Sequence, residues 1–249
     1  MTRPRILAAI VVLLVVGGIG AYVAYDQVLR GDSAPPLAFP SASAAAGASS
    51  APSADPGESA APAASSDGDV AGTWTVTSGS EAGYRVRERL AQFDAETDAV
   101  GRTSDVTGSI TLTSDGTTAT LTEGTITVDT TTLTSDENRR DNRLRSEGLQ
   151  TDEFPTASFT LTQPVEVPAA ALAGTATDIT LVGDLTLHGV TKSVQIPAQA
   201  KLADGTVQVL GSVTFPLSDY DITAPNIGGF IISIADQGAL EFVAVFAKG

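Results

Sequence analysis

Cysteine is absent from this sequence, and histidine occurs once, as His188. The lack of cysteine excludes disulfide bonds, thiolate nucleophiles, iron–sulfur clusters and Cys-ligated zinc. It also excludes the acylated cysteine that anchors a bacterial lipoprotein. With one histidine, a Ser-His hydrolase or a His-rich metal site would depend on His188 alone. We therefore expect no metal site and no cofactor.

Basic residues are also scarce, with 14 Lys and Arg against 29 Asp and Glu and a formal net charge of −15. Such a surface repels phosphate backbones and anionic headgroups. Nucleic acid is therefore not an expected partner, and docking to anionic lipid through basic residues is not expected either.

Charged residues are missing altogether from residues 6–25, which read ILAAIVVLLVVGGIGAYVAY. Twenty helical residues span roughly 30 Å, the thickness of a bilayer core. Arg3 and Arg5 precede this run, so residues 1–5 are predicted to lie in the cytoplasm, with the remainder outside. The alternative is a cleaved signal peptide, which would release a secreted protein. Both interpretations export the rest of the chain.

Large apolar side chains are rare in residues 26–71, which consist mainly of Ala, Ser, Pro, Gly and acidic residues. Such a segment buries too little apolar surface to offset its ordering entropy, and its prolines prevent a long helix. The sequence predicts a disordered stalk that carries the folded domain.

Residues 72–249 form the predicted domain, and its main pattern is alternation of apolar and polar residues with a period of two. Asp115-Gly116, Asp204-Gly205 and His188-Gly189 are typical of tight turns between such strands. We expect eight to ten antiparallel strands and one short helical segment within residues 136–149, lying over one end of a barrel. The apolar stripes are Ile179 to Leu187, Val194 to Ala200, Val207 to Leu217 and Leu240 to Phe246.

Gly183 and Gly211 interrupt two of these stripes and indicate strongly bent strands. Bending of this kind allows a sheet to close into a barrel. A barrel of about eight strands has an interior that side chains fill or that holds one ligand. The sequence leaves both alternatives open.

Two separated motifs and an opening segment resemble the YceI-like family. The first motif is ENRRDNRLRSEGLQTDEFPTASFTLTQPV at residues 137–165, with Arg140, Asp141 and Leu144 followed by Phe154-Pro155 and Phe159. The second is GDLTLHGVTKSVQIP at residues 183–197, and the opening segment is GTWTVTSGSEAGYRV at residues 72–86. The resemblance extends over the whole predicted domain.

This resemblance implies an all-β, antiparallel, lipocalin-like barrel whose tunnel binds a polyisoprenoid or a related lipid, in a periplasmic or secreted setting. It implies no chemistry that requires particular catalytic residues. Residues 81–88 (EAGYRVRE) and 218–227 (SDYDITAPNI) depart from the usual pattern of the family. These departures leave the identity of the lipid open.

The apolar stripes supply the candidate ligand contacts, although any one of these residues could simply pack in the core. The predicted tunnel-lining residues are Tyr84, Val86, Phe93, Phe159, Leu161, Leu185, Leu187, Phe215, Ile232 and Phe242. Arg140, Asp141 and His188 are predicted polar residues of structural importance or at the tunnel mouth. We expect Arg140 and Asp141 to pin the helix to the barrel, and His188 to be a turn residue whose ring bonds backbone.

The sequence therefore predicts a non-catalytic protein that binds an isoprenoid quinone, a polyisoprenoid or a similar amphiphile outside the cytoplasmic membrane. Its role would be storage, sequestration or transfer of that lipid, and the membrane would be contacted through residues 6–25. One alternative is an envelope interaction or structural module with a filled barrel. A less favoured alternative is a hydrolase or isomerase that uses His188. Protein partners, oligomeric state and the direction of transfer cannot be derived from the sequence.

Overall fold

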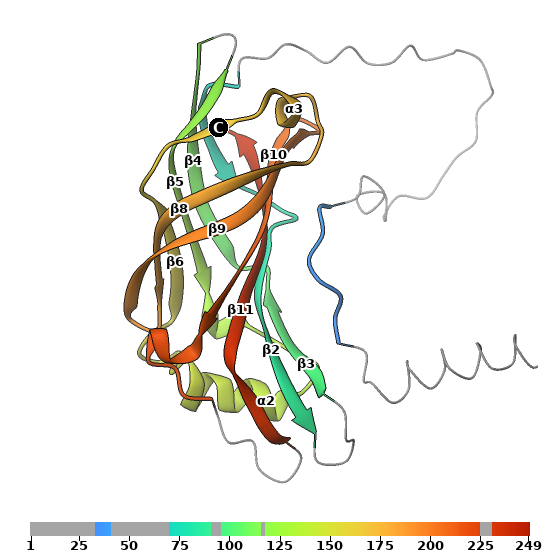
Figure 1. Ribbon diagram of the computed structural model, residues 1–249, viewed down its shortest axis with the longest axis vertical. Coiled ribbons are helices and arrows are strands. Elements are labelled where there is room, and N and C mark those ends of the chain that lie inside the picture. The colour runs from blue at the N-terminus through green and yellow to red at the C-terminus, as the bar shows by residue number, and fades with distance from the viewer. Residues whose placement is uncertain (1–32, 41–69, 91–95, 116–117, 225–230) are drawn as a thin grey trace, which may run out of the picture.

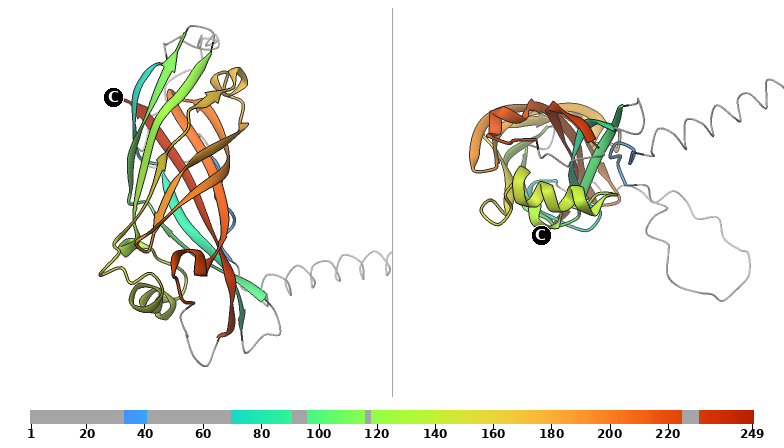
Figure 2. Two further views of the ribbon diagram at one scale, coloured as in Figure 1. Left: turned by 60° about the vertical axis from the view of Figure 1, so that its left-hand side comes forward. Right: turned by 90° about the horizontal axis from the view of Figure 1, so that it is seen from below.

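The computed structural model describes residues 33–40, 70–90, 96–115, 118–224 and 231–249, which form an antiparallel β-barrel (Figures 1 and 2). The strands are β1 (Gly72–Val76), β2 (Glu81–Leu90), β3 (Glu96–Thr103), β4 (Val106–Ser114), β5 (Ala119–Asp129), β6 (Thr156–Leu161), β7 (Val165–Val167), β8 (Thr177–Leu187), β9 (Val190–Ala203), β10 (Thr206–Pro216) and β11 (Ile231–Lys248). The predicted all-β barrel is therefore confirmed.

Eight strands close the barrel in the order β1, β4, β5, β6, β8, β9, β10 and β11, and β11 pairs with β1 again. Closure depends on the length of β11. Its last residues pair with β1, whereas its earlier part pairs with β2, which in turn pairs with β3. In this way β2 and β3 extend the wall beyond the ends of β1 and β4 (Figure 1).

The apolar stripes face the barrel interior, as the alternation predicts. In β8, Leu181, Leu185 and Leu187 are buried while Asp178 and Thr180 are exposed. In β9, the same alternation buries Ile196, Ala198 and Ala200. Side chains alternate between the two faces of a strand, so one face of each strand contributes to a common core.

Two of the predicted turns have the backbone that a two-residue hairpin requires. His188 and Gly189 have φ of 51° and 74°, and they join β8 to β9. Asp204 and Gly205 have φ of 51° and 71°, and they join β9 to β10. Positive φ at both central positions is the type I′ geometry, whose twist matches that of the strands.

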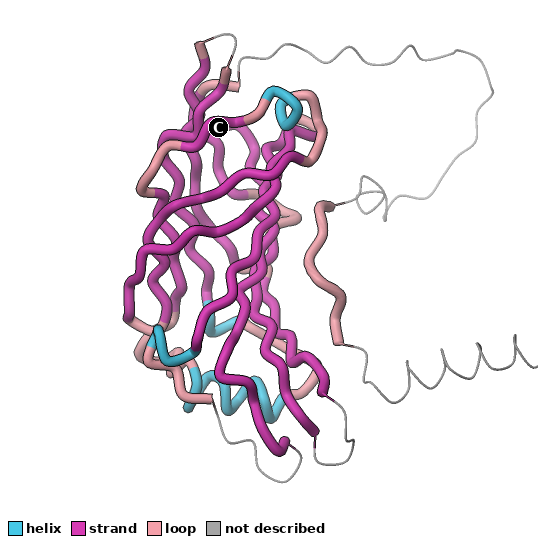
Figure 3. The backbone as a smooth tube through the Cα atoms, in the orientation of Figure 1, coloured by secondary structure: helices cyan, strands magenta, loops and turns pink. Residues whose placement is uncertain are grey.

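A short helical segment covers one end of the barrel (Figure 3). It consists of α2 (Asn138–Arg143) and a π-helical turn at Leu144–Gly148, within the segment that the sequence predicts. Leu144 and Leu149 turn toward the barrel interior and belong to the core at this end. A four-residue helix, α3 (Ala169–Leu172), lies at the opposite end and was not predicted.

The core has two parts, one toward each end of the barrel. The part near the α2 end contains Leu133, Leu187, Phe215 and Tyr220. The other part contains Trp74 and is completed by Leu112, Leu121, Ala200 and Phe246. The ring nitrogen of Trp74 donates a hydrogen bond to the Val70 carbonyl at 3.0 Å, which fixes the start of the domain.

Residues 33–40, a part of the segment predicted to be a disordered stalk, lie extended along the outside of the barrel (Figure 1). We call residues 33–40 the strap. The Arg85 guanidinium donates to the Ala34 carbonyl at 2.9 Å, and the Arg102 guanidinium donates to the Pro35 carbonyl. Composition alone could not indicate this order, because the strap is held by charges on strands far away in sequence.

The predicted membrane helix, residues 6–25, lies outside the residues that the structure describes, as does most of the predicted stalk. Among the described residues, no helix has the length and apolar character needed to cross a bilayer.

Candidate functional site

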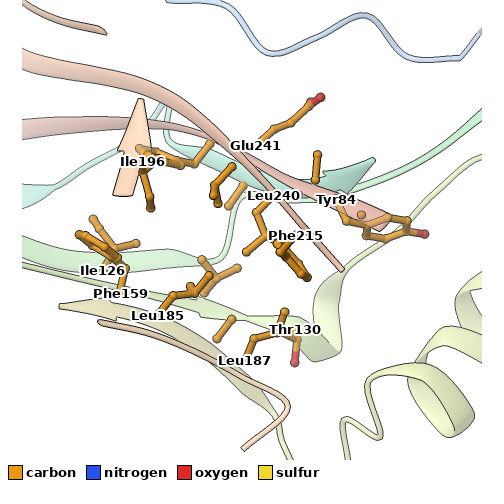
Figure 4. Close-up of a pocket in the computed structure, with 18 of the residues that line it drawn as sticks. Tyr84, Ile126, Thr130, Phe159, Leu185, Leu187, Ile196, Phe215, Leu240 and Glu241 are labelled. Carbon is orange, nitrogen blue, oxygen red and sulfur yellow. The ribbon is translucent and has the colours of Figure 1, made fainter. Parts of the chain in front are cut away.

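A cavity of about 200 Å³ runs inside the barrel, and its exposed lining is almost entirely apolar (Figure 4). Residues of β2, β4, β5, β6 and β8 to β11 form its wall, and Leu133, Arg140, Leu144 and Leu149 close the α2 end. The barrel interior is therefore hollow rather than packed from end to end.

Most residues predicted to line a tunnel do lie on this wall. The structure places Tyr84, Val86, Phe159, Leu161, Leu185, Leu187, Phe215 and Phe242 around the cavity. Phe93 and the side chain of Ile232 lie outside the described residues. That these residues contact a ligand stays a prediction, since their position alone does not show binding.

Aromatic rings of the wall lie against glycines of neighbouring strands, which keeps the rings from filling the cavity. Tyr84 pairs with Gly101, where an added Cβ would come 2.3 Å from the tyrosine ring. In the same way, a Cβ added at Gly183 would come 2.5 Å from the Phe159 ring. The sequence predicts bent strands at Gly183 but does not reveal which side chain the glycine accommodates.

The α2 end of the cavity contains a buried ion pair. Glu88 is 2% exposed, and its Oε1 accepts a hydrogen bond from the Arg140 Nη2 at 2.6 Å. Arg140 also donates to Asp136 and to the Ser135 hydroxyl. Burial raises the pKa of the Glu88 carboxyl, and Arg140 opposes that effect. The pair attaches α2 to β2, as predicted for Arg140, and both residues line the cavity.

Asp141, the other predicted polar residue of the helix, is buried but does not line the cavity. Its carboxylate accepts hydrogen bonds from the Ser135 backbone at 3.1 Å and from the Ser135 hydroxyl at 2.6 Å. These bonds hold the loop that enters the helix. Asp141 therefore positions the segment from which Arg140 reaches Glu88.

Tyr84 contributes a buried hydroxyl to the same end of the cavity. Its residue partner in the adjacent strand is Gly101, and its charged neighbours are Arg140, Asp141 and Glu88. Burial raises the pKa of Tyr84 to about 12. The hydroxyl is therefore neutral across the physiological range and is available as a hydrogen-bond donor.

His188 occupies the turn between β8 and β9 and is not part of the cavity lining. Its Nδ1 lies 3.0 Å from the Tyr220 carbonyl, and its ring makes an edge contact with Phe154 at a centroid distance of 4.6 Å. The contact with backbone is the role predicted for a turn histidine. The position of His188 gives no support to a hydrolase or isomerase that acts inside the cavity.

Sequence reasoning missed Glu88, Leu133, Ile126 and Ile196 as wall residues. The inward position of Glu88 could have been predicted from the sequence, because Glu88 lies two and four residues after Val86 and Tyr84 in β2 and must face the same side. The other charges of this strand face outward. Arg85 bonds Glu241 at 2.6 Å on the outer surface, where the Glu241 carboxylate points away from the cavity in Figure 4.

Comparison with known protein families identifies the domain that contains the cavity. The YceI-like domain model matches residues 74–246, which include all of the strands except the first two residues of β1 and the last two of β11. This chain belongs to the YceI-like family. The earlier resemblance is therefore confirmed, and the YceI-like domain accounts for most of the chain.

Solved structures share the YceI-like fold at low sequence identity. A polyisoprenoid binding domain from Saccharophagus degradans, implicated in plant cell wall breakdown, has a TM-score of 0.56 and 18% identity, covering 72% of this chain and 99% of its own. BcnA of Burkholderia cenocepacia has a TM-score of 0.50 and 15% identity, covering 67% and 95%. At this identity the likeness establishes the fold alone. No curated protein sequence matches the chain.

Proposed function

We propose that this YceI-like barrel binds one long apolar lipid of the polyisoprenoid type inside its cavity and catalyses no reaction. The observation that carries the proposal is the hollow interior, which is enclosed by a closed sheet and lined almost entirely by apolar side chains. The family and the fold support lipid binding in general, and a polyisoprenoid binding domain shares the fold.

The energetics favour a chain-like ligand. Moving a hydrocarbon chain from water into such a cavity yields about 0.8 kcal/mol for each CH₂ group buried. No directional contact is needed along the chain, so Leu, Val, Ile and Phe walls suffice. The cavity volume of about 200 Å³ lies below the roughly 300–1,000 Å³ of pockets for drug-sized ligands.

We also propose a location at the outer side of the cytoplasmic membrane, which the predicted span and the position of the strap support. The Ser33 hydroxyl donates to the Asp98 carbonyl at 2.9 Å, toward the α2 end of the barrel (Figure 1). Seven residues separate the predicted span from Ser33, and seven residues reach at most about 25 Å. This arrangement would hold the α2 end close to the bilayer, where a lipid could enter for storage, sequestration or transfer.

The modest cavity volume favours a second candidate, an envelope interaction module that holds no ligand. The two are separated by isolating the full chain in a mild detergent from a bacterial host and identifying its bound lipids by mass spectrometry. We expect an isoprenoid lipid at about one per chain. Absence of bound lipid, together with no uptake of added geranylgeraniol, would overturn lipid binding and leave the interaction module.

Matched variants make this experiment specific to the cavity. Gly124 lines the cavity, so Gly124→Leu places a bulky side chain inside it and is expected to lower lipid content severalfold. Thr160 is exposed on β6, so Thr160→Leu adds the same side chain outside and is expected to leave lipid content unchanged. Equal loss in both variants would contradict binding in the cavity.

A further inference from the structure

The α2 end of the cavity carries polar atoms that the protein itself does not pair. Among the described residues, the Tyr84 hydroxyl, the Glu88 Oε2 and the Arg140 Nε are buried and make no hydrogen bond of normal geometry. Ser135 lies beside the Tyr84 hydroxyl, but its own hydroxyl donates to Asp141 and accepts from the Arg140 Nη1 and the Glu137 backbone N–H. Buried polar groups are paired in most proteins, so three unpaired groups at one site point to a ligand.

All three residues line the same cavity, whose exposed lining is almost entirely apolar. Tyr84, Val86 and Glu88 share one face of β2, and Arg140 approaches from α2. Figure 4 shows the Tyr84 hydroxyl directed to the side of the helical ribbon, away from Phe159 and Leu185. A ligand with one polar end would therefore place that end here and its chain along the rest of the barrel.

The charges around this end disfavour an anionic head. Glu88 and Asp136 both bond Arg140, so two carboxylates face a single guanidinium, and the Asp141 carboxylate lies near the Tyr84 hydroxyl. The Nη1 and Nη2 atoms of Arg140 are already bonded to Asp136 and Glu88. A phosphate or diphosphate would meet a net negative site with only the Arg140 Nε left as a charged donor. Like charges at close range oppose binding, most strongly in a buried site.

The unpaired atoms specify the hydrogen bonds that the head must make. Glu88 Oε2 accepts, so it requires a donor, whereas the Arg140 Nε donates and the Tyr84 hydroxyl can do either. A ketone or a quinone carbonyl only accepts and would leave Glu88 unpaired. A hydroxyl group donates one hydrogen bond and accepts another, and so it can satisfy Glu88 together with Tyr84 or Arg140.

We propose that the α2 end of the cavity is a head-group site for an uncharged hydroxyl, and that the protein selects lipid alcohols or phenols over lipid phosphates. This inference rests on the proposed lipid-binding function and narrows it to a class of head group. Tyr84 and Glu88 are its specificity-determining residues, because they supply the unpaired donor and acceptor.

Competition among four probes with the same C20 isoprenoid chain tests the proposal. They are geranylgeraniol, a geranylgeranylated phenol, geranylgeranyl phosphate and the hydrocarbon that lacks a head group. Native mass spectrometry of the full chain, released from detergent with the probes at equal concentration, gives the occupancy of each. We expect the alcohol or the phenol to exceed both the phosphate and the hydrocarbon by about tenfold, and the better of the two identifies the source of the hydroxyl.

Three variants assign that selectivity to named groups. Tyr84→Phe removes only the hydroxyl and is expected to reduce the preference for alcohol over hydrocarbon about three- to tenfold. Glu88→Gln removes one negative charge and is expected to narrow the gap between alcohol and phosphate. Tyr220→Phe is the control, since its hydroxyl is also buried and unpaired but does not line the cavity.

The failures of the two proposals are distinguishable. Equal occupancy by alcohol and hydrocarbon would overturn the head-group site, because the ligand hydroxyl would then add nothing to the hydrogen bonds that Tyr84 and Glu88 make with water. Lipid binding itself would stand. Preferential occupancy by the phosphate would overturn it as well. Binding of none of the four probes would overturn both the head-group site and the proposed function.

Discussion

Phe242 on β11 lies directly against Gly211 on β10, and the two residues are partners in the sheet. A Cβ added at Gly211 would come 2.7 Å from the Phe242 ring. Together with Tyr84 against Gly101 and Phe159 against Gly183, this contact shows how the barrel stays hollow. Glycine on one strand lets an aromatic ring of another strand lie close to the wall instead of crossing the interior.

The first prediction concerns Gly211→Ala. The added methyl group pushes the Phe242 ring inward, so we expect a loss of about 1–3 kcal/mol in the free energy of unfolding from overpacking. We also expect a clear fall in lipid content, because the displaced ring occupies the cavity. Urea unfolding and lipid extraction of the full chain measure the two effects.

Gly124→Ala is the matched control for this prediction. Gly124 also lines the cavity, but an added Cβ would meet Ile110 and Leu161 at 3.5 Å and 3.6 Å, which are ordinary contacts. We expect its stability and lipid content to stay close to those of the wild type. If Gly211→Ala behaves like Gly124→Ala, the ring-against-glycine explanation of the hollow interior is wrong.

The second prediction concerns stability at high pH. The folded-state pKa of Tyr84 is about 12, above the ordinary value of 10.0, so folding favours the neutral hydroxyl. This contribution is fully present below pH 10 and is lost as the pH rises through 12. A shift of two units corresponds to at most about 2.7 kcal/mol.

Tyr84→Phe removes this titration and leaves the other groups in place, including Tyr220, whose pKa burial also raises. We expect the wild type to lose up to about 2.7 kcal/mol more than the variant between pH 9.5 and 12. The free energy of urea unfolding, measured at several pH values, provides the comparison. Parallel curves for the two proteins would show that Tyr84 is not buried as described.

The third prediction concerns the buried pair of Glu88 and Arg140. Glu88→Ala leaves the Arg140 charge poorly compensated and is expected to cost about 3–5 kcal/mol in the free energy of unfolding. The double variant Glu88→Leu with Arg140→Met removes both charges and keeps apolar volume, so its stability should return close to that of the wild type. A double variant as unstable as Glu88→Ala would argue that packing, and not charge, holds α2 on β2.

Alternation was sufficient to predict the strands and many of their inward residues, because a half-buried strand repeats every two residues whatever its neighbours are. Closure into a barrel was indicated by Gly183, Gly211 and the family resemblance. The stripe from Ile179 to Leu187 shows this directly. The partnership of Gly211 with Phe242 could not be predicted in this way. It depends on the register between two strands, which a single sequence does not specify.

The polar residues at the α2 end of the cavity could be predicted from the sequence only in part. Arg140 was expected to pin the helix, but its partner Glu88 was read only as part of a charged early strand. The strap was missed for a related reason. Its own residues show no strand or helix periodicity, and Arg85 and Arg102 hold its Ala34 and Pro35 carbonyls across more than fifty residues of sequence.

The last prediction tests the orientation that the strap gives to the barrel. The chain contains no cysteine, so a single introduced cysteine can carry a fluorescent dye without competing sites. Ser146 is exposed beside α2, and Ala170 is exposed on α3 at the opposite end (Figure 1). With the full chain in phosphatidylcholine vesicles that contain a head-group quencher, we expect strong quenching of the dye on Ser146→Cys and little on Ala170→Cys.

The strap explains this difference, because it leaves only seven residues, or at most about 25 Å, between the predicted span and the α2 end of the barrel. Arg102→Gln weakens the hydrogen bond to the Pro35 carbonyl. When this substitution is added to each labelled protein, the difference in quenching between the two dye positions should become smaller. Equal quenching at both positions without this substitution would mean that the barrel tumbles freely on its tether. Stronger quenching at Ala170→Cys would mean that the opposite end faces the membrane, and lipid would then have to enter past the core around Trp74.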